Sequence, residues 1–249
     1  FYLKAYLRIL EAEKNLTPGL EHVFYIRHWG IAPTLSFPLM LASLNTDDSD
    51  ETVARKIDTL AAYIETFVVR RSVNYRNFSA SSIRYTMYSL VKEIRGKDLA
   101  SLQAVLTQKL QDMKESFDGL DKFRMHGQNK RFVKFLLARM TAWCEQQAGM
   151  SSNFVTYYAP SSGKPFEVEH IWADKFLRHK DQFEQENEFQ NYRNRLGGLV
   201  LLPRGTNQSY GDLPYEDKQT HYIKENLLVK SLCSLAYENN PNFLGLNKR

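Results

Sequence analysis

The stretch PFEVEHIWADKF, residues 165–176, places a carboxylate and an imidazole side by side at Glu169 and His170. Apolar and polar residues alternate over FEVEH, residues 166–170, and this period of two predicts a β-strand. Neighbouring residues on a strand point to opposite faces. Both side chains therefore serve one site only if the strand ends or bends there, which predicts a chemical site at the end of this strand.

The segments around this strand predict a small unit with strands after residue 150. NFVTYYA at 153–159 predicts a preceding strand, joined to the next by the turn PSSGKP at 160–165. A helical stretch follows at 182–194, and the apolar run GLVLLP at 198–203 is bounded by glycine and proline, as is typical of a buried strand. After a polar, turn-rich stretch the chain reads helical again, so the local order is strand, insertion, strand and short helix.

Residues 1–150 carry a helical pattern instead. In 51–72, 101–113 and 130–144, apolar side chains recur at steps of three and four, as on one face of an α-helix. These apolar positions are Val53, Ile57, Leu60, Ile64, Phe67 and Val68, then Leu102, Leu106, Leu110 and Met113, then Phe132, Leu136, Met140 and Trp143. Residues 117–130 are rich in turn formers and predict a connection. The prediction is a mainly α protein, with a helical domain over 1–150 that scaffolds and couples a smaller domain.

The composition limits the class of protein. The 249 residues carry a formal net charge of +5, with 43% hydrophobic and 24% charged residues, as in ordinary globular domains. No apolar run is long enough to cross a bilayer, so we expect a cytoplasmic protein without membrane association. Cys144 and Cys233 form no Cys-x-x-Cys pair, which argues against a thiolate zinc site and predicts two buried thiols in a reducing compartment. The positive charge suits a polyanionic partner such as nucleic acid.

Two segments together resemble the HNH, or ββα-metal, nuclease motif, and more closely the HNH domain at the C-terminus of GmrSD-type modification-dependent restriction enzymes. These segments are VEHIWADKF at 168–176 and YRNRLGGLVLLPRGTNQSYGDLPYEDK at 192–218. The matching positions are Glu169-His170-Ile171, Leu196-Gly197-Gly198-Leu199, Asn207, and Pro214-Tyr215-Glu216-Asp217-Lys218. Upstream, residues 63–79 resemble the helical segment that precedes the nuclease core. The resemblance implies a ββα-metal core within 151–249, followed by C-terminal helices.

The resemblance also implies roles for these residues in phosphodiester hydrolysis. A neutral imidazole takes the proton from water at physiological pH, and this role falls to His170. A divalent metal, Mg²⁺ or Mn²⁺, would neutralise negative charge on the phosphate, and such ions prefer oxygen ligands. Glu169 is expected to supply a carboxylate and Asn207 an amide oxygen to this metal.

Gly198 departs from the family pattern. Many relatives carry an asparagine at this position, where it orients the histidine by a hydrogen bond across the loop. Asn194, four residues earlier, is a candidate for the same role. The alternative is a catalytically weakened module that keeps the fold for DNA binding or assembly.

Several basic residues are candidates for contact with nucleic acid. Arg195 and Lys218 lie inside the motif, and two further clusters lie outside it, where cations would bind phosphates without reading sequence. These clusters are Arg70, Arg71 and Arg76, and Lys130, Arg131 and Lys134. Solvated helix faces are the alternative interpretation of both clusters, and the sequence does not separate DNA from RNA as the substrate.

The resemblance implies a restriction or anti-phage enzyme that nicks DNA, including modified phage DNA. Its partner would be an N-terminal ParB-like domain that hydrolyses nucleotides. The chain begins at Phe1, and we expect it to be a fragment from which this domain is missing. No Gly-x-x-x-x-Gly-Lys loop occurs in the chain, so we expect no nucleotide hydrolysis by these residues.

Overall fold

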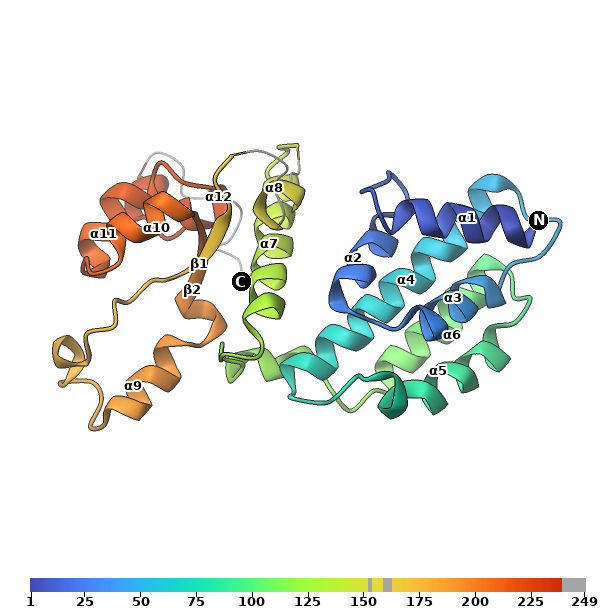
Figure 1. Cartoon of the computed structure of the whole chain (residues 1–249), viewed down its shortest axis with the longest axis horizontal. Coiled ribbons are helices and arrows are strands. Elements are labelled where there is room, and N and C mark those ends of the chain that lie inside the picture. The colour runs from blue at the N-terminus through green and yellow to red at the C-terminus, as the bar shows by residue number, and fades with distance from the viewer. Residues whose placement is uncertain (152–153, 159–162, 239–249) are drawn as a thin grey trace. The chain divides into compact units, whose positions relative to one another are not determined.

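The computed structural model describes residues 1–151, 154–158 and 163–238, and its internal contacts divide the chain into two units (Figure 1). Unit 1 is Phe1–Leu120 and unit 2 is Asp121–Arg249. Most of the described residues are helical, as expected, and a small antiparallel hairpin lies in unit 2. The helical pattern of the sequence ends near residue 150, but the structure places the boundary at 120/121 because the helix over 130–147 packs on the hairpin.

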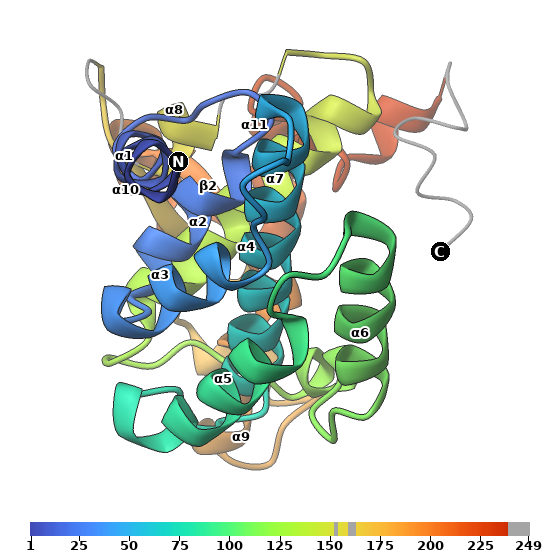
Figure 2. The same ribbon diagram turned by 90° about the vertical axis from the view of Figure 1, so that its right-hand side faces the viewer.

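Unit 1 is built around one long helix. Its elements are α1 (Tyr2–Ala12), α2 (Glu21–Trp29), α3 (Pro33–Ala42), α4 (Asp50–Val73), α5 (Ala80–Ile94), α6 (Leu99–Gln111) and the 3₁₀ turn η1 (Phe117–Asp121). Helices α2, α3 and α6 pack against α4, and α5 packs against α3 (Figure 2). Ser49 caps α4 by accepting a hydrogen bond from the Thr52 amide at 3.1 Å. The six apolar positions predicted for this helix are all buried, which confirms its amphipathic pattern.

Unit 2 surrounds the hairpin with short helices. Its elements are α7 (Lys130–Gln147), α8 (Phe154–Tyr158), β1 (Phe166–His170), η2 (Phe176–His179), α9 (Glu186–Arg193), η3 (Leu196–Gly198), β2 (Leu199–Pro203), α10 (Arg204–Tyr210), α11 (Tyr215–Tyr222), α12 (Leu227–Lys230) and η4 (Ser234–Tyr237). Both strands of the hairpin were predicted, as was the helical insertion between them. Helix α10 follows β2 without a loop, in a stretch that the sequence suggested to be turn-rich.

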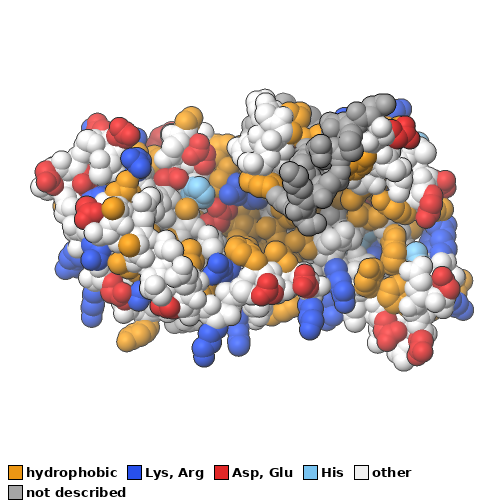
Figure 3. All heavy atoms as spheres, turned by 180° about the vertical axis from the view of Figure 1, so that it is seen from behind, with side chains coloured by type: hydrophobic (Ala, Val, Ile, Leu, Met, Phe, Trp, Pro, Cys, Tyr) orange, Lys and Arg blue, Asp and Glu red, His pale blue; other side chains and the backbone are white. Residues whose placement is uncertain are grey.

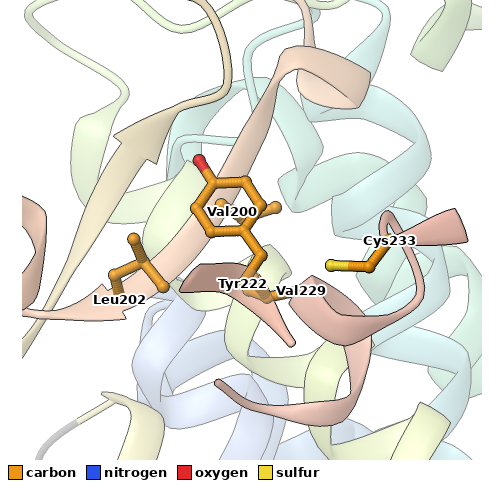
Figure 4. Close-up of a cluster of buried hydrophobic side chains, with 5 residues drawn as sticks. All are labelled: Val200, Leu202, Tyr222, Val229 and Cys233. Atoms are coloured by element: carbon orange, nitrogen blue, oxygen red, sulfur yellow. The ribbon is translucent and has the colours of Figure 1, made fainter. Parts of the chain in front are cut away.

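The register of the hairpin sorts its side chains between two faces. β1 and β2 are antiparallel, with His170 opposite Leu199 and Glu169 opposite Val200. Residues that lie opposite one another share a face, so Glu169 and His170 point to different sides of the sheet. Figure 4 shows the side of Val200, where a buried cluster joins β2 to α11 and α12. This cluster consists of Val200, Leu202, Tyr222, Val229 and Cys233.

Two sequence predictions for unit 2 are wrong. The stretch at 153–159 was expected to be a strand, but 154–158 is helix α8, and residues 153 and 159 lie outside the described residues. The aromatic rings of Phe154 and Tyr158 both pack on Phe135 of α7, and this tertiary contact favours helical over alternating spacing. The buried side of α7 is also displaced from the predicted one, because Val133 and Phe135 are buried whereas Met140 and Trp143 are partly exposed.

Among the described helices, none combines the length and the apolar character that crossing a lipid bilayer requires. Cys144 and Cys233 are both buried, as predicted, and no disulfide joins them.

Candidate active site

A pocket of about 680 Å³ opens beside β1 in unit 2. Its walls come from α7, α8, β1 and α10, so the fold brings together side chains that lie far apart in the sequence. The charged, imidazole and amide side chains that line it are Lys130, Arg131, Lys134, Glu167, His170 and Asn207. Five of these six were predicted as site residues from the sequence, and the structure places them in one cavity.

A hydrogen bond from Asn194 orients the His170 ring. The distance from His170 Nε2 to Asn194 Oδ1 is 2.9 Å, and Asn194 Nδ2 donates to the backbone carbonyl of Gln190 at 2.7 Å. A carbonyl can only accept, so the Asn194 amide must point its nitrogen at Gln190 and its oxygen at His170. The histidine must then donate from Nε2, which leaves Nδ1 as the basic nitrogen. Among the described residues, none bonds to this Nδ1.

The surroundings of His170 keep the ring neutral. Burial lowers the pKa of His170 to about 4, and Arg193 adds to this effect, whereas the bond to Asn194 acts in the opposite sense. At neutral pH the imidazole therefore carries no charge, and Nδ1 is able to accept a proton.

Glu169 lies on the other face of the strand, in a buried ion pair. The distance from Lys218 Nζ to Glu169 Oε1 is 2.5 Å, and the same ammonium donates to the His170 carbonyl at 2.9 Å. The Lys218 side chain is 0% exposed and that of Glu169 is 6% exposed. Burial raises the pKa of Glu169, and the bond and charge of Lys218 oppose that rise. These two contacts of Lys218 join helix α11 to the end of β1.

Asn207 has a different carboxylate as its neighbour. The structure places Asn207 on α10, with its Nδ2 at 3.5 Å from Glu167 Oε2, and both side chains line the pocket. Glu167 also lies 3.4 Å from Nε of Arg204, and both of these side chains reach solvent. The pocket thus holds one carboxylate and one amide next to each other.

The predicted pair of metal ligands does not converge in this structure. Glu169 is closed in by Lys218 and does not line the pocket, whereas Asn207 does. In the described part of the chain, no group of three or more His, Cys, Asp and Glu side chains is arranged to hold a metal ion. The oxygen donors that the pocket offers to a hard divalent cation are those of Glu167 and Asn207.

The three cations of α7 form one wall of the pocket. Arg131 is held by a hydrogen bond from its Nε to the Tyr158 hydroxyl at 3.0 Å. Lys134 is half-buried, and its pKa is lowered by burial while the charge of Glu167 opposes this. Lys130 is exposed at the helix start. On the face drawn in Figure 3, Lys and Arg side chains form separate groups among acidic and neutral ones. The three cations of α7 share this pocket with His170.

The other predicted phosphate contacts lie elsewhere. Arg70 and Arg71 belong to unit 1 and donate to the backbone carbonyls of Leu110 and Asn77 in that unit. Arg195 is exposed and lies over the Tyr192 ring, 5.0 Å from its centroid. Lys218 was a candidate for DNA contact, but its ammonium is buried and bonded inside the protein, so this interpretation is corrected.

Three residues of the site were missed by sequence reasoning. Glu167 lies two residues before Glu169, and strand alternation alone places both on one side of the sheet. Tyr158 lies in the segment that was misread as a strand. Arg193 donates to the Trp172 carbonyl at 2.9 Å beside the strand end, and no sequence signal marked it out.

A known protein family matches the part of the chain that contains this pocket. Residues 86–239, more than half of the chain, match the family described as GmrSD restriction endonucleases, C-terminal domain. No curated protein and no solved structure matches the chain.

Proposed function

Because the chain belongs to the family of GmrSD restriction endonuclease C-terminal domains, we propose that unit 2 hydrolyses DNA phosphodiesters with His170 as its general base. The observation that carries this proposal is the arrangement of His170. Its Nε2 is held by Asn194, its Nδ1 is basic, and it lines a pocket with three cations on the facing helix. The Asn194 contact fixes one tautomer of this half-buried histidine, as the role of general base requires.

The pocket supports a simple hydrolytic step. Nδ1 of His170 takes a proton from water, the water oxygen bonds to phosphorus, and the bond from phosphorus to the leaving sugar oxygen breaks. The leaving oxygen takes its proton from solvent. Asn194 Oδ1 stabilises the imidazolium that forms, because it accepts a hydrogen bond from the Nε2–H group throughout. Lys130, Arg131 and Lys134 would bind the phosphate oxygens and stabilise the charge that grows on them.

A divalent cation, Mg²⁺ or Mn²⁺, is part of the proposal. When bound, it would neutralise charge on the phosphate and polarise the scissile group. Of the two ligands expected from the sequence, Asn207 lies in the pocket.

The biological setting is also proposed from the family. One such pocket cuts one strand, so nicking is the expected product. The family name places this domain in a restriction endonuclease, which makes modified or phage DNA the expected substrate. A ParB-like domain that hydrolyses nucleotides would be its partner.

A supercoiled plasmid assay tests the function. We expect Mg²⁺ or Mn²⁺ to support conversion to open circles, EDTA to stop it, and His170→Ala to slow it by about a hundredfold or more. His126→Ala is the matched control, because His126 is an exposed histidine of the same unit outside the pocket. Equal rates for His170→Ala and the wild type would exclude His170 as the base. An intact plasmid with every metal would favour a module that binds DNA without cutting it.

A further inference from the structure

Helix α5 of unit 1 presents one polar and aromatic side to solvent, which we call the α5 face. Its residues recur at steps of three and four along the helix and surround a surface hollow of about 390 Å³. They are Ser81, Arg84, Tyr85, Tyr88, Ser89 and Lys92. The buried residues of the helix are Ile83, Met87, Leu90 and Ile94. These attach α5 to the core of unit 1, where it packs against α3 and α6, and in Figure 1 it forms the lower edge of this unit.

Two tyrosine rings stand on the α5 face. Tyr85 is 87% exposed and Tyr88 is 44% exposed. A ring that stays in solvent adds little to the stability of the core, because it buries little apolar surface. Tyrosine is enriched at binding surfaces, where its ring supplies contact area and its hydroxyl forms hydrogen bonds. The two rings therefore indicate a surface that a partner covers.

The charge of the α5 face is positive. Arg84 and Lys92 are exposed, and within the described residues their side chains make no hydrogen bond and no ion pair. None of the described side chains that line the hollow is acidic. Residues 66–92 contain five Lys and Arg residues and no Asp or Glu. In the same stretch, Arg70 and Arg71 are already bonded to backbone carbonyls of unit 1, so the two cations of α5 are the ones available to an anionic partner.

The shape of the α5 face suits duplex DNA. All of its residues belong to one helix, and from Ser81 to Lys92 they extend about 16 Å along the helix axis. The major groove of B-form DNA admits an α-helix, and an exposed helix side with arginine, lysine, serine and tyrosine offers donors to phosphates and to base edges. A single strand is held instead in a groove between elements, with its bases stacked on aromatic rings. A face carried by a single helix therefore favours the duplex.

We propose that the α5 face binds the major groove of duplex DNA, with Arg84 and Lys92 on phosphates and Tyr85 and Tyr88 directed at base edges. The choice of DNA as the partner rests on the proposed function, whereas the place of the contact rests on the exposure and the charge of the face. The phosphate contacts position the helix, and the base-edge contacts give it a sequence preference. Unit 1 thereby contributes to substrate binding as well as unit 2.

The test is the binding of a labelled DNA duplex to the full 249-residue chain, measured by fluorescence anisotropy at several salt concentrations. Every protein carries His170→Ala, so that the duplex is not cut. Arg84→Ala and Lys92→Ala are each expected to lower the affinity and to reduce its logarithmic salt dependence by about one ion. Tyr85→Ala is expected to lower the affinity by roughly fivefold or more without changing the salt dependence. Arg55→Ala, which removes an exposed arginine of α4 outside the face, should change neither quantity.

Competitors that occupy one groove locate the contact. Methyl green fills the major groove and distamycin fills the minor groove. We expect methyl green to weaken binding less in the double variant Arg84→Ala/Tyr85→Ala than in the reference protein, and distamycin to affect both proteins equally. An equal effect of methyl green on both would overturn the assignment to the major groove. Unchanged affinity and salt dependence in all the α5 variants, with circular dichroism like that of the reference, would overturn the proposal and favour a protein partner for this face.

Plasmid nicking by the chain with His170 intact separates this inference from the proposed function. Nicking together with unaltered DNA binding in the α5 variants would contradict the inference and keep the nuclease. DNA binding that depends on Arg84, Tyr85 and Lys92, in a chain that never nicks, would support the inference and contradict the nuclease.

Discussion

At the scale of single residues, the chemistry of the site depends on how His170 is held. The chain of contacts runs from the Gln190 carbonyl to the Asn194 amide and from there to His170 Nε2. The Gln190 carbonyl can only accept, so the Asn194 amide must donate to it from Nδ2 and accept from His170 with Oδ1. The backbone of α9 thereby determines which nitrogen of the His170 ring is basic. Asn194 therefore orients the base without touching the substrate.

Replacing Asn194 by alanine tests this role. Asn194→Ala leaves the ring free to turn and to adopt the other tautomer, so we expect the nicking rate to fall by roughly ten- to a hundredfold with little change in DNA affinity. Asn191→Ala, at an exposed position of the same helix, is the control. An unchanged nicking rate in Asn194→Ala would show that something else orients His170.

Close backbone packing around Gly198 accounts for a glycine at this position, where the family pattern predicts asparagine. Its carbonyl accepts a hydrogen bond from the Ile171 amide at 2.9 Å, so it lies against the end of β1. A Cβ atom at this position would meet the Arg193 carbonyl oxygen at 2.8 Å, which is closer than such atoms come in real structures. The backbone here is closed to any side chain, and Asn194 takes the orienting position.

Gly198→Asn, which introduces the residue expected from the family pattern, is therefore expected to damage the protein. We expect the free energy of unfolding in urea to fall by about 1–3 kcal/mol and nicking not to increase. Gly197→Asn is the matched control, because a Cβ at Gly197 meets no atom within 4 Å. Equal stability of the two variants would contradict the close approach at Gly198.

At the scale of elements, α7 has two functions. Its buried side, with Val133 and Phe135, packs on the hairpin and on α8. Lys130 and Lys134 of the same helix line the pocket. The same helix thus builds the core of unit 2 and places cations where a phosphate would lie.

Removing these cations should weaken DNA binding in a manner that salt reveals. Lys130→Ala and Lys134→Ala are each expected to lower the affinity and to reduce the slope of log affinity against log salt by about one. Fluorescence anisotropy with labelled DNA at several salt concentrations measures both quantities. Lys224→Ala, an exposed lysine of unit 2 outside the pocket, should change neither. A slope that is the same in all three variants would remove α7 from the DNA interface.

At the scale of the whole molecule, the boundary between the two units does not coincide with the change in sequence pattern near residue 150. The helical pattern runs to about residue 150, but α7 belongs to the core of unit 2. A small hairpin buries too little apolar surface by itself to be stable. Helix α7 supplies the missing surface.

Two truncated chains test this boundary. Residues 121–249 are expected to unfold in one cooperative transition, whereas residues 151–249, which lack α7, are expected to show none. Thermal unfolding followed by circular dichroism compares the two. Cooperative unfolding of the shorter chain would mean that α7 is dispensable for the core.

Local features of the fold could be predicted from the order of the residues alone. Strand alternation located β1, glycine and proline bounded β2, and the motif pointed to His170, Asn194 and Asn207. These signals are carried by neighbouring residues, and local backbone geometry suffices to interpret them.

Which side chains contact one another depends on how distant segments pack in the folded chain. Lys218 lies 49 residues from Glu169, and their ion pair closes one carboxylate, whereas Asn207 lies 40 residues from Glu167 and meets the open one. The helical form of α8 and the unit to which α7 belongs were likewise decided by packing. Contacts between distant segments leave no period in the sequence, so only the folded chain showed which acid faces the pocket.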